Sequence, residues 1–471
     1  MALGGLAASQ PTLAHDGDSR GESRDDTREV RETREVRDGD RSGSGERSGA
    51  NERSGSGDRD KDKDKDKDRD RDHSGSNSSG SNSSGGNSGG SGRSGDESRR
   101  DQTRAEDSRR GRGRDSRFDV ERDASGADRE RNEVLLIGPS AASDAVRGAG
   151  FSVISENRLE TLRQTLIRVR VRDGETVEHT VETLREVAPG IRVAPNHVFH
   201  ASQASPASTL VGKIEPLRAP RRGDTAQIGV IDTGADISLP RLDSRVHMYR
   251  GFAPGGYTSR PHGTAVAQLA SSLGANVAVA DVFGLDKQRQ LVAPAELIAM
   301  AIDWMLSENV RILNISIEGP RNDVLEFVVD AAVAQGALII AAAGNGGPAA
   351  APGYPAAYPG VVAVTALDER GVIYRRAARG DHIQFAARGT YAPGQSMVDT
   401  DTTISGTSFA APVVAAEAAR QWRQAPTASR EQVLAAMRGN AIDMGAPGRD
   451  PIYGWGDVDP WRLSGATRAS R

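Results

Sequence analysis

The stretch Thr403–Pro412, TISGTSFAAP, decides how the rest of the chain is interpreted. A glycine and small hydroxyl residues end an irregular segment, and an alanine-rich run over residues 410–419 follows at once, which predicts a buried helix. Ser408 then lies at the helix start, where free backbone N–H groups and the helix dipole favour negative charge. Such a serine is suited to be a nucleophile whose attack forms an oxyanion, although an N-cap on a core helix is equally compatible with this stretch alone.

Two other positions carry the side chains that a nucleophilic serine requires. Asp232 ends the apolar run 228–231, which places a carboxylate at the carboxyl end of a predicted strand. His262 opens a helix rich in alanine and valine. An acid–base–nucleophile set needs a histidine to accept the serine proton and an aspartate to fix the histidine tautomer. The chain order is Asp, His, Ser, with separations of 30 residues (262 − 232) and 146 residues (408 − 262).

The sequence from residue 224 onward predicts an α/β fold with a doubly wound, mostly parallel sheet. Nearly continuous apolar runs are typical of strands buried on both faces, and helical segments lie between them. The expected helices cover residues 262–273, 294–308, 323–335 and 429–438. The candidate strands are Ile228–Asp232, Val277–Phe283, Ile312–Ile317, Leu338–Ala342 and Val361–Thr365. In such sheets function gathers at the carboxyl ends of the strands, which is where Asp232 lies.

Residues 133–200 predict a smaller α+β module ahead of that domain. Order is expected to begin at Glu133. Strands are expected at 134–137, 151–155 and 166–171, with a last strand made of 191–193 and 198–199, and helices at 140–149 and 175–187. This βαββαβ order is that of a split-βαβ, ferredoxin-like module. Residues 201–223, which contain Pro, Ser and Arg, predict an exposed linker.

The first 132 residues are low in complexity. They include alternating Lys or Arg and Asp over residues 61–72 and tracts of Ser, Gly and Asn, so little apolar area offsets the entropy of ordering and disorder is predicted. The mixed charge argues against a basic arm for nucleic acid. Residues 1–14 are small and apolar and resemble the second half of an export signal without its basic start. This predicts a secreted or periplasmic protein. The alternative is a chain terminus without a targeting role.

Composition excludes several classes of function. The 471 residues contain no cysteine, which rules out disulfides, thiol catalysis and cysteine-ligated zinc. No run of 18 apolar residues is present, so no transmembrane helix is expected. The net charge of −4 is small for this length and indicates no particular partner.

Residues 224–466 closely resemble a subtilisin-like serine protease of the peptidase S8 family. The segments DTG at Asp232, HGT at His262 and GTSFAAP around Ser408 match the three catalytic motifs of that family in their chain order. A fourth segment, AAAGNG at 341–346, is similar to the one whose asparagine donates its side-chain amide to the oxyanion, which implies that role for Asn345. The resemblance implies an endopeptidase that forms an acyl-enzyme on Ser408, acts on protein or peptide substrates and needs no cofactor.

The resemblance also implies roles for other segments. Many such proteases carry a βαββαβ propeptide that assists folding, blocks the cleft and is removed autocatalytically. Residues 133–200 are therefore expected to be an intramolecular inhibitor, with the maturation site in the linker 201–223. His197 and His200 near the end of this module are either pH sensors for its release or plain exposed histidines. The residues expected to bind substrate are Ser316, Ile317, Glu318, Ala343 and Gly344.

The chain departs from the family pattern at three places. Ala265 stands where a second histidine is common, which predicts a change of packing and no lost step. No Asp/Asn-rich loop follows His262 to form the calcium site of many relatives, so no metal is expected. Glu318 replaces a glycine at the substrate-binding edge. It is interpreted as a bias toward basic side chains in the substrate, as narrowed access to the cleft, or as a solvent-facing glutamate.

Three other functions compete with this interpretation. The segment VIDTGAD at 230–236 reads like an aspartic protease, but that chemistry needs two carboxylates and the chain has no second Asp-Thr-Gly or Asp-Ser-Gly. A degenerate protease domain serving as a binding scaffold is disfavoured because all four catalytic positions are intact. A protein whose main role is surface tethering through its charged N-terminal region is the third.

Overall fold

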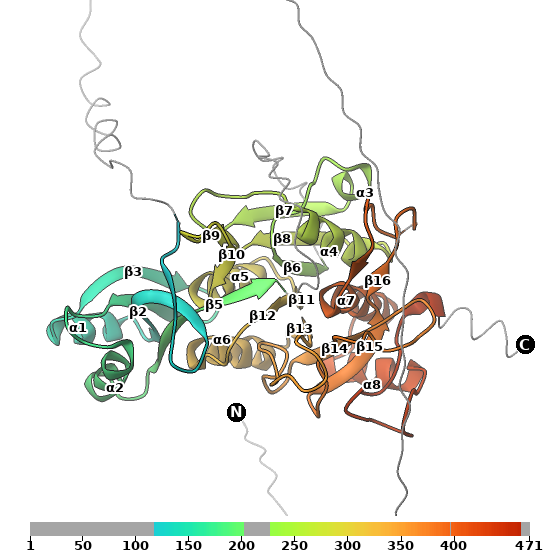
Figure 1. The fold of residues 1–471 in the computed structure, drawn as a ribbon. Helices are drawn as coiled ribbons and strands as arrows, with labels where there is room; N and C mark the ends of the chain where they lie inside the picture. The colour runs from blue at the N-terminus through green and yellow to red at the C-terminus, as the bar shows by residue number, and fades with distance from the viewer. Residues whose placement is uncertain (1–116, 202–226, 396, 463–471) are drawn as a thin grey trace, which may run out of the picture. The chain divides into compact units, whose positions relative to one another are not determined.

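A computed structural model describes residues 117–201, 227–395 and 397–462 (Figure 1). The expectations for the export signal, for disorder over residues 1–116 and for residues 202–223 of the linker lie outside these ranges. No helix in the described part of the chain is both long and apolar enough to cross a membrane.

The N-terminal module has the βαββαβ order that the sequence predicts. Its helices are α1 (Ala141–Gly148) and α2 (Val177–Val187), and its main strands are β2 (Asp128–Gly138), β3 (Ser152–Leu159), β4 (Gln164–Arg170) and β5 (Arg192–Ala201). The sheet order is β3-β4-β2-β5 with antiparallel pairs, the order of a ferredoxin-like fold. Val146 of α1 and Val181 and Leu184 of α2 pack with Leu136 and Val169 of the sheet in one core.

The module begins earlier than Glu133, so the boundary predicted from the sequence was wrong. A short strand, β1 (Val120–Arg122), pairs antiparallel with β2, which itself starts at Asp128. These residues are charged and resemble the low-complexity region before them. Pairing explains their order: buried Arg129 binds Glu121 at 3.1 Å and Glu178 of α2 at 2.6 Å. The last strand is also continuous through Pro195, where two separate pieces were expected.

The second domain contains a seven-stranded parallel sheet in the order β15-β14-β13-β11-β6-β8-β7. Five strands match the predicted apolar runs: β6 (Ile228–Asp232), β8 (Val277–Asp281), β11 (Ile312–Ile315), β13 (Leu338–Ala342) and β14 (Val362–Leu367). The two edge strands, β7 (Val246–Gly251) and β15 (Ile383–Arg388), were not expected. Residues of β7 are half-buried or exposed, because an edge strand needs no continuous apolar run.

Helices cover both faces of this sheet. On one face α5 (Ala295–Ser307) and α6 (Asp323–Ala334) share a core with the sheet; on the other, α4 (Pro261–Ser271) and the buried α7 (Thr407–Gln424) do so. Two further helices are α3 (Pro240–Asp243) and α8 (Arg430–Asn440). The short strands are β9 (Gly284–Leu285), β10 (Leu291–Pro294), β12 (Ile317–Glu318), β16 (Thr390–Tyr391) and β17 (Ile404–Ser405). The doubly wound fold predicted from residue 224 onward is confirmed.

The last residues of β5 lie between two strands of the second domain (Figure 1). On one side they pair antiparallel with β10, with Phe199 opposite Ala293. On the other side they pair antiparallel with β12, with His200 opposite Glu318 and Ala201 opposite Ile317. The end of the N-terminal module is therefore a middle strand among strands of the domain that carries the catalytic motifs.

Candidate active site

Asp232 and His262 meet where the end of β6 faces the start of α4. The carboxylate Oδ1 of Asp232 lies 2.7 Å from Nδ1 of His262, and both side chains are buried. Gly263 lets the helix approach this closely, because a Cβ there would overlap the Thr233 carbonyl. The Thr233 hydroxyl accepts a hydrogen bond from the Gly263 N–H at 2.9 Å, and the Thr233 N–H donates to Asp232 Oδ1 at 2.6 Å. These bonds fix the positions of both the carboxylate and the imidazole.

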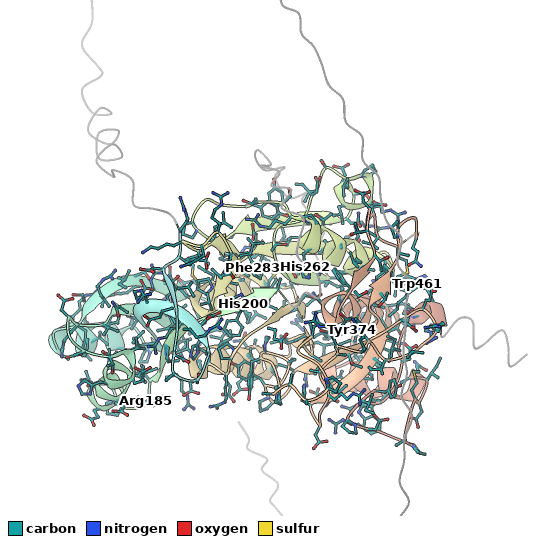
Figure 2. The ribbon with its side chains drawn as sticks, viewed as in Figure 1. Arg185, His200, His262, Phe283, Tyr374 and Trp461 are labelled. Carbon is teal, nitrogen blue, oxygen red and sulfur yellow. The ribbon has the colours of Figure 1, made fainter. Side chains whose placement is uncertain are left out.

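The contact with Asp232 sets the tautomer of His262. A carboxylate at Nδ1 requires the proton on that nitrogen, so Nε2 carries a lone pair. Nε2 is buried and has no hydrogen-bond partner among the described residues. The ring of His262, labelled in Figure 2, packs on Phe409 with 5.2 Å between ring centroids. Phe409 follows Ser408 in the first turn of α7, so the imidazole lies beside the segment that carries the predicted nucleophile.

Ser408 is the second residue of α7 and is fully buried. Its carbonyl accepts a hydrogen bond from the Ser316 hydroxyl at 2.9 Å. Ser316 lies between β11 and β12, so this bond ties the helix of the predicted nucleophile to the predicted substrate-binding edge. The expectation from sequence that Ser408 begins a buried helix agrees with α7.

Asn345 follows the carboxyl end of β13 and is held by Thr407, the residue before Ser408. Its side-chain Oδ1 accepts hydrogen bonds from the Thr407 N–H at 3.1 Å and from the Thr407 hydroxyl at 3.3 Å. The same hydroxyl accepts from the Gly344 N–H at 3.1 Å. Because Oδ1 faces Thr407, the amide NH₂ of Asn345 points away from it. Ala343 is anchored by its N–H to the Val364 carbonyl at 3.0 Å.

Glu318 was interpreted from the sequence, as one of three possibilities, as a solvent-facing glutamate, but its carboxylate lies against backbone. Its Oε2 accepts a hydrogen bond from the Asn345 N–H at 3.3 Å. Its Oε1 lies 2.5 Å from where a Cβ on Gly344 would stand, and 2.9 Å from the corresponding point on Gly353. Burial raises the pKa of this carboxyl above its ordinary value.

A second buried carboxylate, Asp281, lies beside Asp232 in the register of β6 and β8. It accepts hydrogen bonds from the Thr258 N–H at 2.8 Å and the Phe283 N–H at 3.2 Å, and burial raises its pKa to about 7. Asp232 Oδ2 has no hydrogen-bond partner among the described residues, so the two carboxylates do not form the proton-sharing pair of an aspartic protease.

The substrate-binding residues predicted from sequence lie around the end of β5. Ile317 and Glu318 pair with it, Ser316 directly precedes them, and Gly344 lies against the Glu318 carboxylate with Ala343 before it in the chain. Phe199 of β5 is fully buried, and its ring lies so close to Gly319 that a Cβ there would overlap it. His200 (Figure 2) bonds Asp128 at 3.1 Å, whereas His197 is buried, which excludes the exposed interpretation for His197.

Sequence reasoning missed three contributors to the site. Thr233 and Thr407 lie inside the DTG and GTS motifs, and their hydroxyls were the available signal. The third is the pairing of the end of β5 with Ile317 and Glu318; the sequence predicted a module that blocks the cleft and a strand at 198–199, but not this pairing. Ala265 is buried in α4. Within the described ranges, no three His, Asp or Glu side chains are grouped in a way that would hold a metal ion.

The N-terminal module makes a second set of contacts, on α5. The carboxylate of Glu296 at the start of α5 accepts hydrogen bonds at 2.9 Å from Ser155 and Asn157 of β3, and that of Asp303 accepts two at 3.0 Å from backbone N–H groups of Thr161 and Leu162. Arg168 of β4 also pairs with Glu296 at 3.1 Å. The module is therefore fixed both at β5 and at α5.

Known proteins are similar to this chain in sequence and in fold. The sequence model of the subtilase family matches residues 223–456. The minor extracellular protease Epr of Bacillus subtilis is 32% identical over 251 residues, which cover 50% of this chain and 38% of Epr. Subtilisin DY of Bacillus licheniformis is 30% identical over 241 residues, which cover 48% of this chain and 86% of subtilisin DY.

One solved structure is similar over a larger share of the chain. Fervidolysin from Fervidobacterium pennivorans, a keratinolytic enzyme related to subtilisin, has a TM-score of 0.56 at 20% identity, and the match covers 76% of this chain and 64% of that one. This likeness concerns the fold alone. It covers a larger part of the chain than the family match over residues 223–456, which spans about half of it. The chain spans less than two thirds of Epr and of fervidolysin. The family match and the subtilisin relatives show that this chain belongs to the subtilase family (peptidase S8) of serine endopeptidases.

Proposed function

We propose that the chain hydrolyses peptide bonds through an acyl-enzyme formed on Ser408. Ser408 attacks the scissile carbonyl while Nε2 of His262 accepts the serine proton, and His262 then returns this proton to the leaving amine. Asp232 holds the imidazole in the required tautomer and stabilises the imidazolium. A water molecule hydrolyses the acyl-enzyme by the reverse sequence of proton transfers.

The observation that carries this proposal is the 2.7 Å contact between Asp232 Oδ1 and His262 Nδ1. It leaves Nε2 as the basic nitrogen, next to the first turn of α7, where Ser408 lies. The oxyanion would be held by the side-chain amide of Asn345 and the backbone N–H of Ser408. The contacts of Asn345 Oδ1 with Thr407 support this role, because they turn the amide NH₂ away from Thr407.

We further propose that the N-terminal module is an inhibitory propeptide that binds as a product does. An antiparallel strand beside β12 is the arrangement expected of a peptide substrate added to a free sheet edge. Ala201 is opposite Ile317, and a substrate strand bound in the same register would place its next residue opposite Ser316, whose hydroxyl bonds the Ser408 carbonyl. The first self-cleavage would then follow Ser202 and leave Gln203 as the new N-terminus.

Expression of the full chain as wild type and as Ser408→Ala tests both proposals. The wild type should react with a fluorophosphonate at Ser408 and yield a product that begins at Gln203, as read by intact mass and by mass spectrometry of its N-terminal peptide. Ser408→Ala should stay full length and unlabelled, while Ser405→Ala, a matched control in β17, should behave as the wild type does. A folded wild type that is neither labelled nor cleaved would favour a binding scaffold instead.

We propose that the protein is exported, on the basis of its similarity to an extracellular relative. Epr is by its name an extracellular protease, and the sequence of residues 1–14 resembles part of a signal. Fractionation of the producing cells should place the processed protein in the medium or the periplasm. Recovery of processed enzyme from the cytoplasm would contradict this expectation.

A further inference from the structure

The side chain of Glu318 lies in a space that two glycines leave open. A Cβ on Gly344 would stand 2.5 Å from its Oε1, and a Cβ on Gly353 would stand 2.8 Å from its Cγ. The backbones on either side are joined by a pair of hydrogen bonds at 3.0 Å between Gly319 and Tyr354. Three segments therefore enclose this carboxylate: β12 with Gly319, residues 343–345, and residues 353–354.

This space adjoins the place where the proposed reaction occurs. One wall carries Asn345, whose N–H bonds Glu318 Oε2 at 3.3 Å and whose side chain is held by Thr407. Another wall begins at Ser316, which is bonded to the Ser408 carbonyl. A substrate that continues the register of β5 places its P1 residue, the one whose carbonyl Ser408 attacks, opposite Ser316. The P1 side chain would thus enter the space that holds the Glu318 carboxylate.

The charge of Glu318 is not matched by a basic partner in the described part of the chain. Among the described residues, its carboxylate accepts a hydrogen bond only from the Asn345 N–H. Burial raises the pKa of this carboxyl, whereas His200 of β5, opposite Glu318, acts to lower it and leaves with the propeptide in the proposed function. A partly buried carboxylate with so few donors is costly, and a guanidinium or ammonium group would supply the donors that it lacks.

We propose that Glu318 makes this protease select arginine or lysine at P1. The inference rests on the proposed function, because it assigns specificity to the same site. Self-cleavage does not depend on this preference, because the end of β5 is held in place by its pairing with β10 and β12. The competing outcome, which the small Ser202 also fits, is that Glu318 fills the space and favours small P1 side chains whatever their charge. The two hypotheses differ in how fast the enzyme should cleave after a neutral side chain of the same size as arginine.

The test compares two peptides that differ only in arginine or citrulline at P1, a charged and a neutral side chain of the same shape. Self-processed full-chain enzyme is first titrated with a fluorophosphonate, so that rates refer to reactive Ser408. The wild type should show a kcat/KM ratio of arginine to citrulline of about tenfold or more. Glu318→Gln should bring this ratio close to one, while Glu308→Gln, a change at an exposed residue after α5, should keep the ratio of the wild type.

Each result decides between the possibilities. A labelled, active wild type with a ratio near one overturns the inference and leaves the proposed function standing. Failure to label Ser408 at all overturns the proposed function instead. A ratio that Glu318→Gln does not change also overturns the inference, and a rise in cleavage of both peptides in Glu318→Ala identifies Glu318 as a plug. If Glu318→Gln does not fold, the wild-type ratio alone still decides.

Discussion

Nδ1 of His262 lies 2.7 Å from Oδ1 of Asp232, and this contact joins the first turn of α4 to the carboxyl end of β6. The two residues are 30 positions apart in the sequence, and the close approach depends on Gly263, where a side chain would overlap Thr233. The contact determines which imidazole nitrogen is basic, and it therefore controls the proposed chemistry at Ser408.

Asp232→Asn should reduce kcat by roughly 10³–10⁴-fold while leaving the fold intact. An asparagine amide at this position would donate to Nδ1 of His262, which would place the imidazole proton on Nε2 and remove the base. Steady-state kinetics on a peptide substrate and a thermal melt would check both parts. A loss below about tenfold in a folded variant would show that Asp232 does not set the tautomer.

Thr407→Val should lower kcat by about tenfold, because the hydroxyl that holds Asn345 Oδ1 and the Gly344 N–H is removed. Asn345→Ala should cost more, roughly 10²–10³-fold, the loss found when an oxyanion donor is removed from a subtilisin. Thr407→Ser keeps the hydroxyl and is the matched control. Equal rates for the valine and serine variants would mean that the backbone N–H of Thr407 alone orients the amide.

The sequence was informative wherever the physical cause of a feature is local. The apolar run before Asp232 and the alanine-rich segment after Ser408 each meet the packing needs of one buried element, so β6 and α7 follow from them. By contrast, β10 pairs with β9 on one side and with the end of β5 on the other, and nothing in the local sequence signals the pairing with β5. The direction of the Glu318 side chain depends on space left by Gly344 and Gly353, which are distant in the chain.

Phe199→Ala should weaken the hold of the N-terminal module on the active-site edge. Phe199 is fully buried over Gly319, and loss of a buried phenylalanine side chain costs about 3–5 kcal/mol. The time between self-cleavage and the appearance of activity against an added peptide should therefore shorten. His179→Ala, a change at an exposed residue of α2, is the control and should leave that time unchanged. An unaltered lag in Phe199→Ala would argue against inhibition through β5.

His197 provides a contact that acid should break. It is buried where β5 meets the start of α6, and its Nδ1 lies 3.2 Å from Nδ2 of Asn322, an amide donor that requires an unprotonated imidazole nitrogen. Burial lowers the pKa of His197 from 6.5 to about 4, although Asp123, at 3.9 Å from Nε2, partly opposes this. The same Asn322 caps α6, so the histidine contacts a rigid element.

Release of the module should therefore accelerate as the pH falls from about 6.5 toward 4. Above this range His197 is neutral in both the docked and the released module, and the contact with Asn322 is intact. Within this range the released module binds a proton at His197 that the docked module excludes. At pH 5 this difference weakens docking by on the order of 2 kcal/mol. The lag before activity, measured from pH 8 to pH 5, should shorten on the acid side for the wild type. His197→Gln cannot take up this proton and is the control. Glu130 acts in the opposite direction, because burial beside Glu133 raises its pKa to about 9. Its contribution is the same in both proteins and cancels when their lags are compared at each pH. Parallel pH profiles for the two proteins would show that His197 does not control release.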